Sequence, residues 1–233
     1  MSKTDELTNE ARAMRKPVSG IAGQGGSGAI AQLIQQYCPN GVEYKKLGEV
    51  CLMERGKGFS KSDISKEGNP IILYGELYTT YKDYITSVSS HTTKTIGTCV
   101  YANTGDLLLP ISSTTKEAQI GRASVLCKDN VIVGGDAIIL HHKQNPGYLM
   151  YLINSNWFEI EKMKCVSGTT IMHLSPTKLA NLEIPVPPLV VQEEIVKILD
   201  RFAVYAAELQ AELQARQQQY EYYRDQLLTF KRV

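Results

Sequence analysis

Basic, hydroxyl and aromatic side chains gather in several short stretches of this sequence. Residues 55–61 form a glycine-bearing loop in which Lys57 and Lys61 could neutralise phosphates, since glycine lets the backbone approach a surface closely. Residues 74–81 combine tyrosines and threonines with Glu76, whose carboxylate can accept a hydrogen bond from a cytosine amine. The other hydroxyl-rich stretches are residues 112–119 and 168–170. Each could be an ordinary solvated turn, but together they favour contact with DNA.

Motifs that would indicate an enzyme are incomplete. The tetrapeptide at residues 145–148 resembles the Asn/Asp-Pro-Pro-aromatic motif of an adenine methyltransferase, but Gly147 replaces the second proline. No convincing glycine loop for a cofactor accompanies it, and the histidines and cysteines lack metal-ligand spacing. We therefore expect a chain with no catalytic centre, no cofactor and no metal ion of its own.

Bulk composition limits the class of protein. The 233 residues carry a net charge of +1, so binding to nucleic acid would depend on local groups rather than on a basic surface as a whole. No stretch is apolar and long enough to cross a membrane, the N-terminus does not read as a signal peptide, and the 5 cysteines are scattered. We expect a cytoplasmic protein with reduced thiols.

A long C-terminal helix is expected over residues 188–233. Its apolar residues repeat at alternating steps of four and three, which predicts a coiled coil. The seam consists of Ile195, Leu199, Phe202, Ala206, Leu209, Leu213, Tyr220 and Leu227. About forty residues at about 1.5 Å each give a rod of roughly 60 Å, too long to bury its stripe on one domain. A helix folded flat on its own domain is the alternative, but only its first turns would reach, so we expect a second copy as partner.

One globular domain, residues 31–187, lies between a polar, glycine-rich lead-in (residues 1–30) and the helix. Short β-rich runs separated by turn residues predict strands in this domain. The strands are expected at residues 50–55, 70–74, 98–101, 106–109, 123–126 and 137–141. Helical spacing predicts a helix over residues 148–162 and a short helix capped by Ser175. The fold class is therefore α+β, with a mixed β-sheet core followed by one long helix.

The junction of domain and helix carries a recognisable motif. Residues 184–202 resemble the motif IPxPPLxxQxxIvxiLdxF of specificity subunits of type I restriction-modification systems, where it joins a target-recognition domain to a conserved helix. Shorter stretches agree in order, namely residues 38–42, 74–81, 105–108, 120–122, 148–155 and 168–170. A complete subunit of this family has two recognition domains and two helices. This chain has one of each and resembles half a subunit.

The resemblance implies a non-catalytic subunit that binds double-stranded DNA and pairs with a second copy of itself. Two identical halves would read a bipartite inverted repeat with a spacer set by the helix. A separate methyltransferase subunit would bind S-adenosylmethionine and modify the DNA, and a restriction subunit could join. Carried over by position, the DNA-contacting residues are Lys57, Lys61, Tyr74, Glu76, Tyr78, Thr79, Tyr81, Ser112, Thr114, Lys116, Thr169 and Thr170.

The sequence leaves a second class of function open. The chain could be a coiled-coil adaptor or decoy that binds the methyltransferase or a full-length specificity subunit without reading DNA itself. Methyl transfer that depends on an added methyltransferase subunit would favour DNA recognition.

Overall fold

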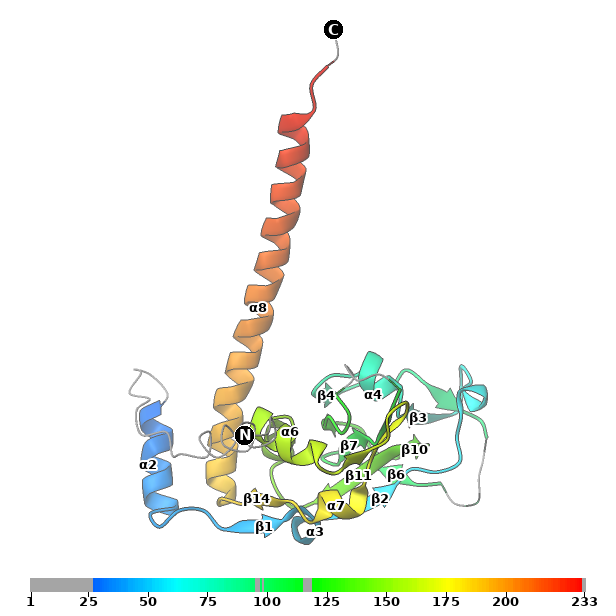
Figure 1. The fold of residues 1–233 in the computed structure, drawn as a ribbon, viewed down its shortest axis with the longest axis vertical. Helices are drawn as coiled ribbons and strands as arrows, with labels where there is room; N and C mark the ends of the chain where they lie inside the picture. The colour runs from blue at the N-terminus through cyan, green and yellow to red at the C-terminus, as the bar shows by residue number, and fades with distance from the viewer. Residues whose placement is uncertain (1–26, 95–96, 98, 115–118, 232–233) are drawn as a thin grey trace.

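The structure, a computed structural model, describes residues 27–94, 97, 99–114 and 119–231 (Figure 1). The lead-in expected over residues 1–30 falls almost entirely outside this part of the chain. A globular body of mixed sheets and short helices lies at one end of a long helix, which projects away from it. The predicted fold class, α+β with a long C-terminal helix, is confirmed.

Mixed β-sheets form the centre of the globular body. The largest sheet, in the order β2–β11–β7–β9–β4, consists of β2 (Cys51–Arg55), β11 (Ala137–His142), β7 (Leu107–Pro110), β9 (Ser124–Leu126) and β4 (Tyr84–Ile85). A second sheet, in the order β5–β3–β10–β6, consists of β5 (His91–Thr92), β3 (Asn69–Leu73), β10 (Val131–Gly134) and β6 (Tyr101–Ala102). The pairs β4–β9 and β3–β10 are parallel, and the other pairs within these two sheets are antiparallel.

Alternating side chains of the largest sheet enter two different cores. On β7, Leu107 and Leu109 belong to one hydrophobic cluster and Leu108 belongs to another. Successive side chains of a strand point to opposite faces, so this sheet is covered on both sides. Helices cover one face, and the second sheet packs on the other through side chains such as Ile72 and Val131. Burial on both faces explains why the central strands are continuous apolar runs in the sequence.

Two smaller sheets join distant parts of the chain. β1 (Tyr44–Lys46) pairs antiparallel with β14 (Glu183–Pro185). In a three-stranded sheet, β13 (Met172–Leu174) lies between β12 (Val166–Ser167) and β8 (Ser112–Ser113). The β13–β8 pair places His173 opposite Ser112, which is 61 residues away in the sequence.

Short helices flank the sheets, and side chains cap the starts of α5 (Pro146–Ile153) and α7 (Pro176–Ala180). The other short helices are α2 (Ser27–Tyr37), α3 (Leu47–Val50), the 3-10 helix η1 (Lys61–Asp63), α4 (Glu76–Thr79) and α6 (Asn156–Met163). Asn145 caps α5 by accepting a hydrogen bond from the Tyr148 N–H at 3.1 Å. Ser175 caps α7 in the same way, as the sequence predicts.

The prediction of one helix over residues 148–162 is wrong, because α5 and α6 are separate. The side chain of Asn154 pairs with the backbone of Ala123: its oxygen accepts from the N–H at 2.8 Å and its amide donates to the carbonyl at 2.9 Å. Ser155 then takes an extended backbone conformation in front of α6. A tertiary contact, invisible to local periodicity, therefore ends α5.

The long helix α8 spans Leu189–Leu228, a length of 40 residues. Its first turns are packed on the globular body, where Val191 and Gln192 are buried. From Arg201 onward every described side chain of the helix is exposed. The alternative of a helix folded flat on its own domain is therefore wrong. Figure 1 shows α2 running beside the base of α8, with which it is in contact.

A buried glutamine fixes the base of α8. The side-chain oxygen of Gln192 accepts from the Asn145 N–H at 3.0 Å. Its amide nitrogen donates to the side-chain oxygen of Gln144 and to the carbonyl of Pro187, each at 2.8 Å. Because the Gln192 side chain is fully buried, these bonds satisfy polar groups that water cannot reach.

Two further contacts set the direction in which α8 leaves the body. Gly147, in α5, lies so close to α8 that a Cβ atom there would sit 2.9 Å from Val196 Cγ1. The glycine that departs from the methyltransferase motif thus permits helix packing. One turn further along, Asp200 accepts hydroxyl hydrogen bonds from Tyr84 at 3.1 Å and Tyr151 at 2.7 Å. Burial and the Asp200 carboxylate raise the pKa of both tyrosines, which keeps them protonated donors.

Candidate nucleic-acid interface

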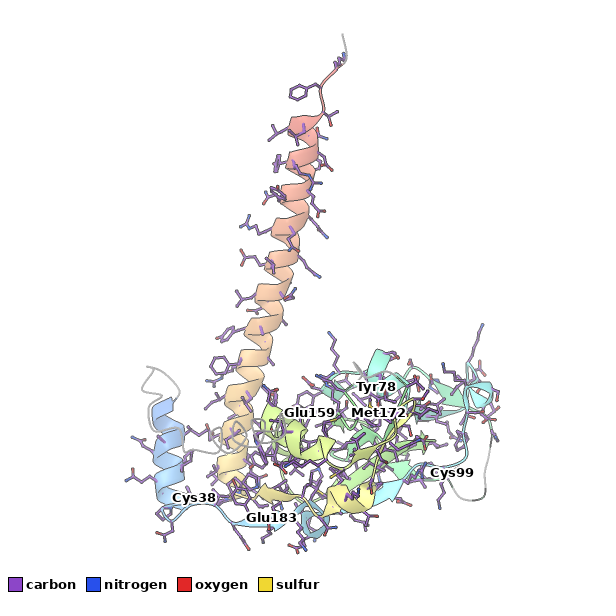
Figure 2. The ribbon with its side chains drawn as sticks, viewed as in Figure 1. Cys38, Tyr78, Cys99, Glu159, Met172 and Glu183 are labelled. Atoms are coloured by element: carbon purple, nitrogen blue, oxygen red, sulfur yellow. The ribbon has the colours of Figure 1, made fainter. Side chains whose placement is uncertain are left out.

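A groove of about 990 Å³ on the globular body collects most of the predicted DNA-contacting residues. Those in its lining are Lys61, Tyr74, Glu76, Tyr78, Thr79, Ser112 and Thr114. They come from η1, from the turn before α4, from α4 itself and from β8 with the residue that follows it. Segments far apart in the sequence thus meet at one surface, on the side of the body where Figure 2 labels Tyr78 and Met172.

A hydrogen-bonded network of charged and polar side chains forms part of this groove. Ser112 Oγ donates to Asp136 Oδ2 at 2.8 Å and lies 2.8 Å from His173 Nδ1. Asp136 is also ion-paired with Arg55. Partial burial raises the pKa of Asp136, but the hydrogen bonds from Ser112 and Arg55 and the charge of Arg55 outweigh it, so that this pKa lies below its ordinary value. Asp136 is therefore a carboxylate at neutral pH that neutralises Arg55.

Two side chains of α4, Tyr78 and Glu76, bind this helix to neighbouring segments that also line the groove. The Tyr78 hydroxyl donates to the carbonyl of Ser112 at 3.0 Å, and burial raises the pKa of Tyr78, so the donor stays protonated. The carboxylate of Glu76 accepts from the Leu73 N–H at 2.8 Å and from the Ser90 hydroxyl at 2.5 Å. One oxygen of Glu76 thus fixes the turn before α4 and the other binds Ser90, between β4 and β5, while each retains a lone pair for a further donor.

Tyr81, a predicted DNA contact, lies in the core. Only 9% of the residue is exposed, and its ring packs in the cluster between the two large sheets. Its hydroxyl accepts from the Ser89 N–H at 3.1 Å. The structure therefore gives Tyr81 a role in holding the loop after α4, away from the groove.

The remaining predicted contacts lie beside the groove or outside the described residues. Thr169 and Thr170 are exposed and precede Ile171, which lines the groove, but neither threonine lines it. Lys57 is exposed and also lies outside the lining. Lys116 falls outside the part of the chain that the structure describes.

Sequence reasoning missed groove residues that lie outside the hydroxyl-rich stretches. Asp136 lies in the turn between β10 and β11, where the preceding pair of glycines was a weak signal. His173 stands alone between apolar residues of β13, and no local pattern points to it. The apolar lining of Phe59, Ile64, Leu73 and Ile171 was missed for the same reason.

Metal and membrane signals are absent from the described residues. In that part of the chain, no group of three or more histidine, cysteine, aspartate and glutamate side chains could hold a metal ion. No helix there is both long and apolar enough to cross a bilayer.

Comparison with known proteins identifies a family. Residues 39–216 match the model of the type I restriction modification DNA specificity domain. The chain is similar to the type I restriction enzyme EcoR124I/EcoR124II specificity subunit of Escherichia coli, with 29% identity over 202 residues that cover 81% of this chain and 48% of that subunit. It is 42% identical over 137 residues to the putative type I restriction enzyme specificity subunit S.HindORF215P of Haemophilus influenzae, covering 56% of this chain and 33% of that protein.

A solved structure shares the fold. The HsdS subunit from Thermoanaerobacter tengcongensis matches with a TM-score of 0.56 and 21% identity over 90% of this chain and 51% of that one. The chain thus spans about half the length, or less, of these relatives. The predicted resemblance to this family is confirmed. Because the family model covers most of its length, the chain belongs to the family of type I restriction-modification DNA specificity domains.

Proposed function

We propose that this chain selects the DNA sequence on which a type I restriction-modification complex acts. The match of residues 39–216 to a DNA specificity domain carries this proposal. The groove supports it, because the groove gathers hydroxyl, aromatic and basic side chains from distant segments at one exposed surface. Such groups contact phosphates and the edges of bases.

A second copy of the chain would supply a second DNA-recognition domain. The long helix leaves its apolar seam exposed, with Leu209 at 67%, Leu213 at 51% and Leu227 at 72%. Two α8 helices packed antiparallel would bury both seams and place one groove towards each end of a rod of roughly 60 Å. Identical readers related by a two-fold axis would recognise a bipartite inverted repeat.

The chemistry would belong to other subunits. A methyltransferase subunit carrying S-adenosylmethionine would dock on this chain and flip the target adenine out of the duplex, and a restriction subunit could join the complex. The methyltransferase-like tetrapeptide of this chain supports this division of labour, since Asn145 caps α5 and Gly147 makes room for α8.

Reconstitution with the methyltransferase subunit of the same system tests the proposal. The purified chain, that subunit, methyl-labelled S-adenosylmethionine and DNA are combined, and each protein is omitted in turn. We expect methyl transfer to DNA only when both proteins are present. Methyl transfer by the chain alone would overturn the proposal. A stable protein complex that selects no DNA sequence would instead indicate the adaptor or decoy.

Replacing Lys57 and Lys61 with alanine should weaken DNA binding uniformly across sequences. Each phosphate contact releases about one counterion, so the slope of log K against log salt concentration should fall by about two units at most. Fluorescence anisotropy over a series of salt concentrations measures this slope. Lys178→Ala is a control, because Lys178 lies in α7 and outside the lining of the groove. An unchanged slope in the double variant would remove residues 55–61 from the DNA footprint.

A further inference from the structure

The single hydroxyl proton of Ser112 determines how the groove network is oriented. Its Oγ lies 2.8 Å from Asp136 Oδ2 and 2.8 Å from His173 Nδ1. Asp136 is ion-paired with Arg55 and ionised, so it can only accept hydrogen bonds. The Ser112 proton is therefore donated to Asp136. Its Oγ must then accept from His173, which requires a proton on Nδ1.

This orientation fixes the tautomer of the neutral His173 ring. A neutral imidazole carries one N–H, and here that proton is on Nδ1, so Nε2 is a bare acceptor. Among the described residues, the hydrogen-bond partner of this ring is Ser112, at Nδ1, so Nε2 is left to accept from a ligand. The side chain is exposed and lines the groove, so this acceptor faces whatever occupies the groove.

The backbone holds His173 on a strand rather than on a loose loop. β13 is the central strand of its sheet, and His173 is directly opposite Ser112 in the register with β8. The neighbouring Met172 and Leu174 are both buried. Since side chains alternate along a strand, burial of these two neighbours directs the imidazole away from the core. A contact presented from a paired strand keeps its geometry better than one presented from a loop.

A neutral acceptor in this position distinguishes between the bases. In the major groove of DNA, adenine offers an amino group at N6 and cytosine offers one at N4. Guanine presents N7 and O6 as acceptors there, and thymine presents O4. A bare Nε2 attracts the amino groups and repels the acceptors. Nε2 has no proton to donate to a phosphate oxygen, and Arg55, the cation of the network, is already neutralised by Asp136.

We propose that His173 is a specificity-determining residue, whose Nε2 accepts a hydrogen bond from the exocyclic amine of an adenine or cytosine in the recognised DNA. Ser112, Asp136 and Arg55 act as positioning residues that hold the ring and its tautomer. The inference rests on the proposed function, because it names the base feature that the DNA-reading groove selects.

Nuclear magnetic resonance of the full chain with isotope-labelled histidine tests the tautomer without DNA. We expect the His173 signals, assigned by their loss in His173→Ala, to show a protonated Nδ1 and an unprotonated Nε2 when the ring is neutral. In Ser112→Ala the ring should shift towards the Nε2–H form that free histidine favours. A neutral ring of the unmodified chain with its proton on Nε2 would overturn the inference.

Base analogues that lack the amine test recognition in the complex with the methyltransferase subunit. In the site that the complex methylates, each adenine is replaced in turn by purine and each cytosine by 2-pyrimidinone. At one position of each half-site, removing the amine should weaken DNA binding by the unmodified chain about tenfold more than it weakens binding by His173→Ala. His173→Ala should bind the intact site about tenfold more weakly. Equal losses in both proteins at every position would overturn the proposal.

The two proposals fail in different ways. A complex that keeps its full sequence preference with His173→Ala would refute the role of His173 and leave the proposed function standing. An unmodified complex with no sequence preference at all would refute both.

Discussion

Replacing Leu209 with aspartate is expected to raise the dissociation constant of the proposed dimer by roughly a thousandfold. Leu209 is 67% exposed in the single chain and lies on the seam of α8. Burying a leucine contributes about 2 kcal/mol, and a two-fold pair loses two of them, so roughly 4 kcal/mol or about three powers of ten are lost. Burial of the new carboxylates would cost more still. Sedimentation velocity or light scattering over a range of concentrations measures the change.

Ala211→Asp is the matched control for this substitution. It adds the same charge two residues further along the same exposed helix, at heptad position f, which faces away from the seam. Its cost in helix propensity is similar and small, about 0.5 kcal/mol, so the dimer should persist. A Leu209→Asp protein that remains dimeric would show that pairing lies elsewhere. If both variants were monomeric, the loss would reflect charge or helicity rather than the seam.

Replacing Gln192 with alanine is expected to lower the free energy of unfolding by about 3 kcal/mol. The fully buried Gln192 bridges Asn145, Gln144 and Pro187, and its removal leaves the Asn145 N–H and the Pro187 carbonyl without this partner. Each buried polar group that loses its partner costs about 1–3 kcal/mol. Denaturant unfolding followed by circular dichroism measures the loss. Because these bonds tie α8 to the body, the variant should also hold the helix less firmly.

Gln210→Ala provides the comparison, since Gln210 is an exposed glutamine of the same helix. Alanine is the better helix former, so the stability of this variant should change by less than about 0.5 kcal/mol. A loss below about 1 kcal/mol in Gln192→Ala would mean that the buried amide contributes little to the attachment of α8.

The sequence revealed α8 and the central strands because their signals are local. A heptad repeat needs only the spacing of residues such as Leu209 and Leu213 to be visible. The buried strand β10 was not predicted, since Val131–Gly134 is too short to separate from its flanking turns without knowing that it pairs with β3. The break between α5 and α6 depends on the pairing of Asn154 with Ala123, which is also tertiary.

The groove was predictable in part for the same reason. Clusters of hydroxyl and aromatic residues marked α4 and the stretch after β8, and the structure brings these to one surface. Composition could not show that Tyr81 turns inward, because the same loop presents its neighbours outward. Nor could it show that β13 pairs with β8, and that pairing alone places His173 next to Ser112.

Mapping the methylated positions in the genome of a host that expresses this chain with its methyltransferase subunit tests the central claim most directly. Two identical readers related by a two-fold axis predict an inverted repeat of one half-site, with a spacer of constant length and methylated adenines at symmetric positions. Methylation at a site with two unrelated halves, or at an undivided sequence, would contradict the pairing of two copies of this chain.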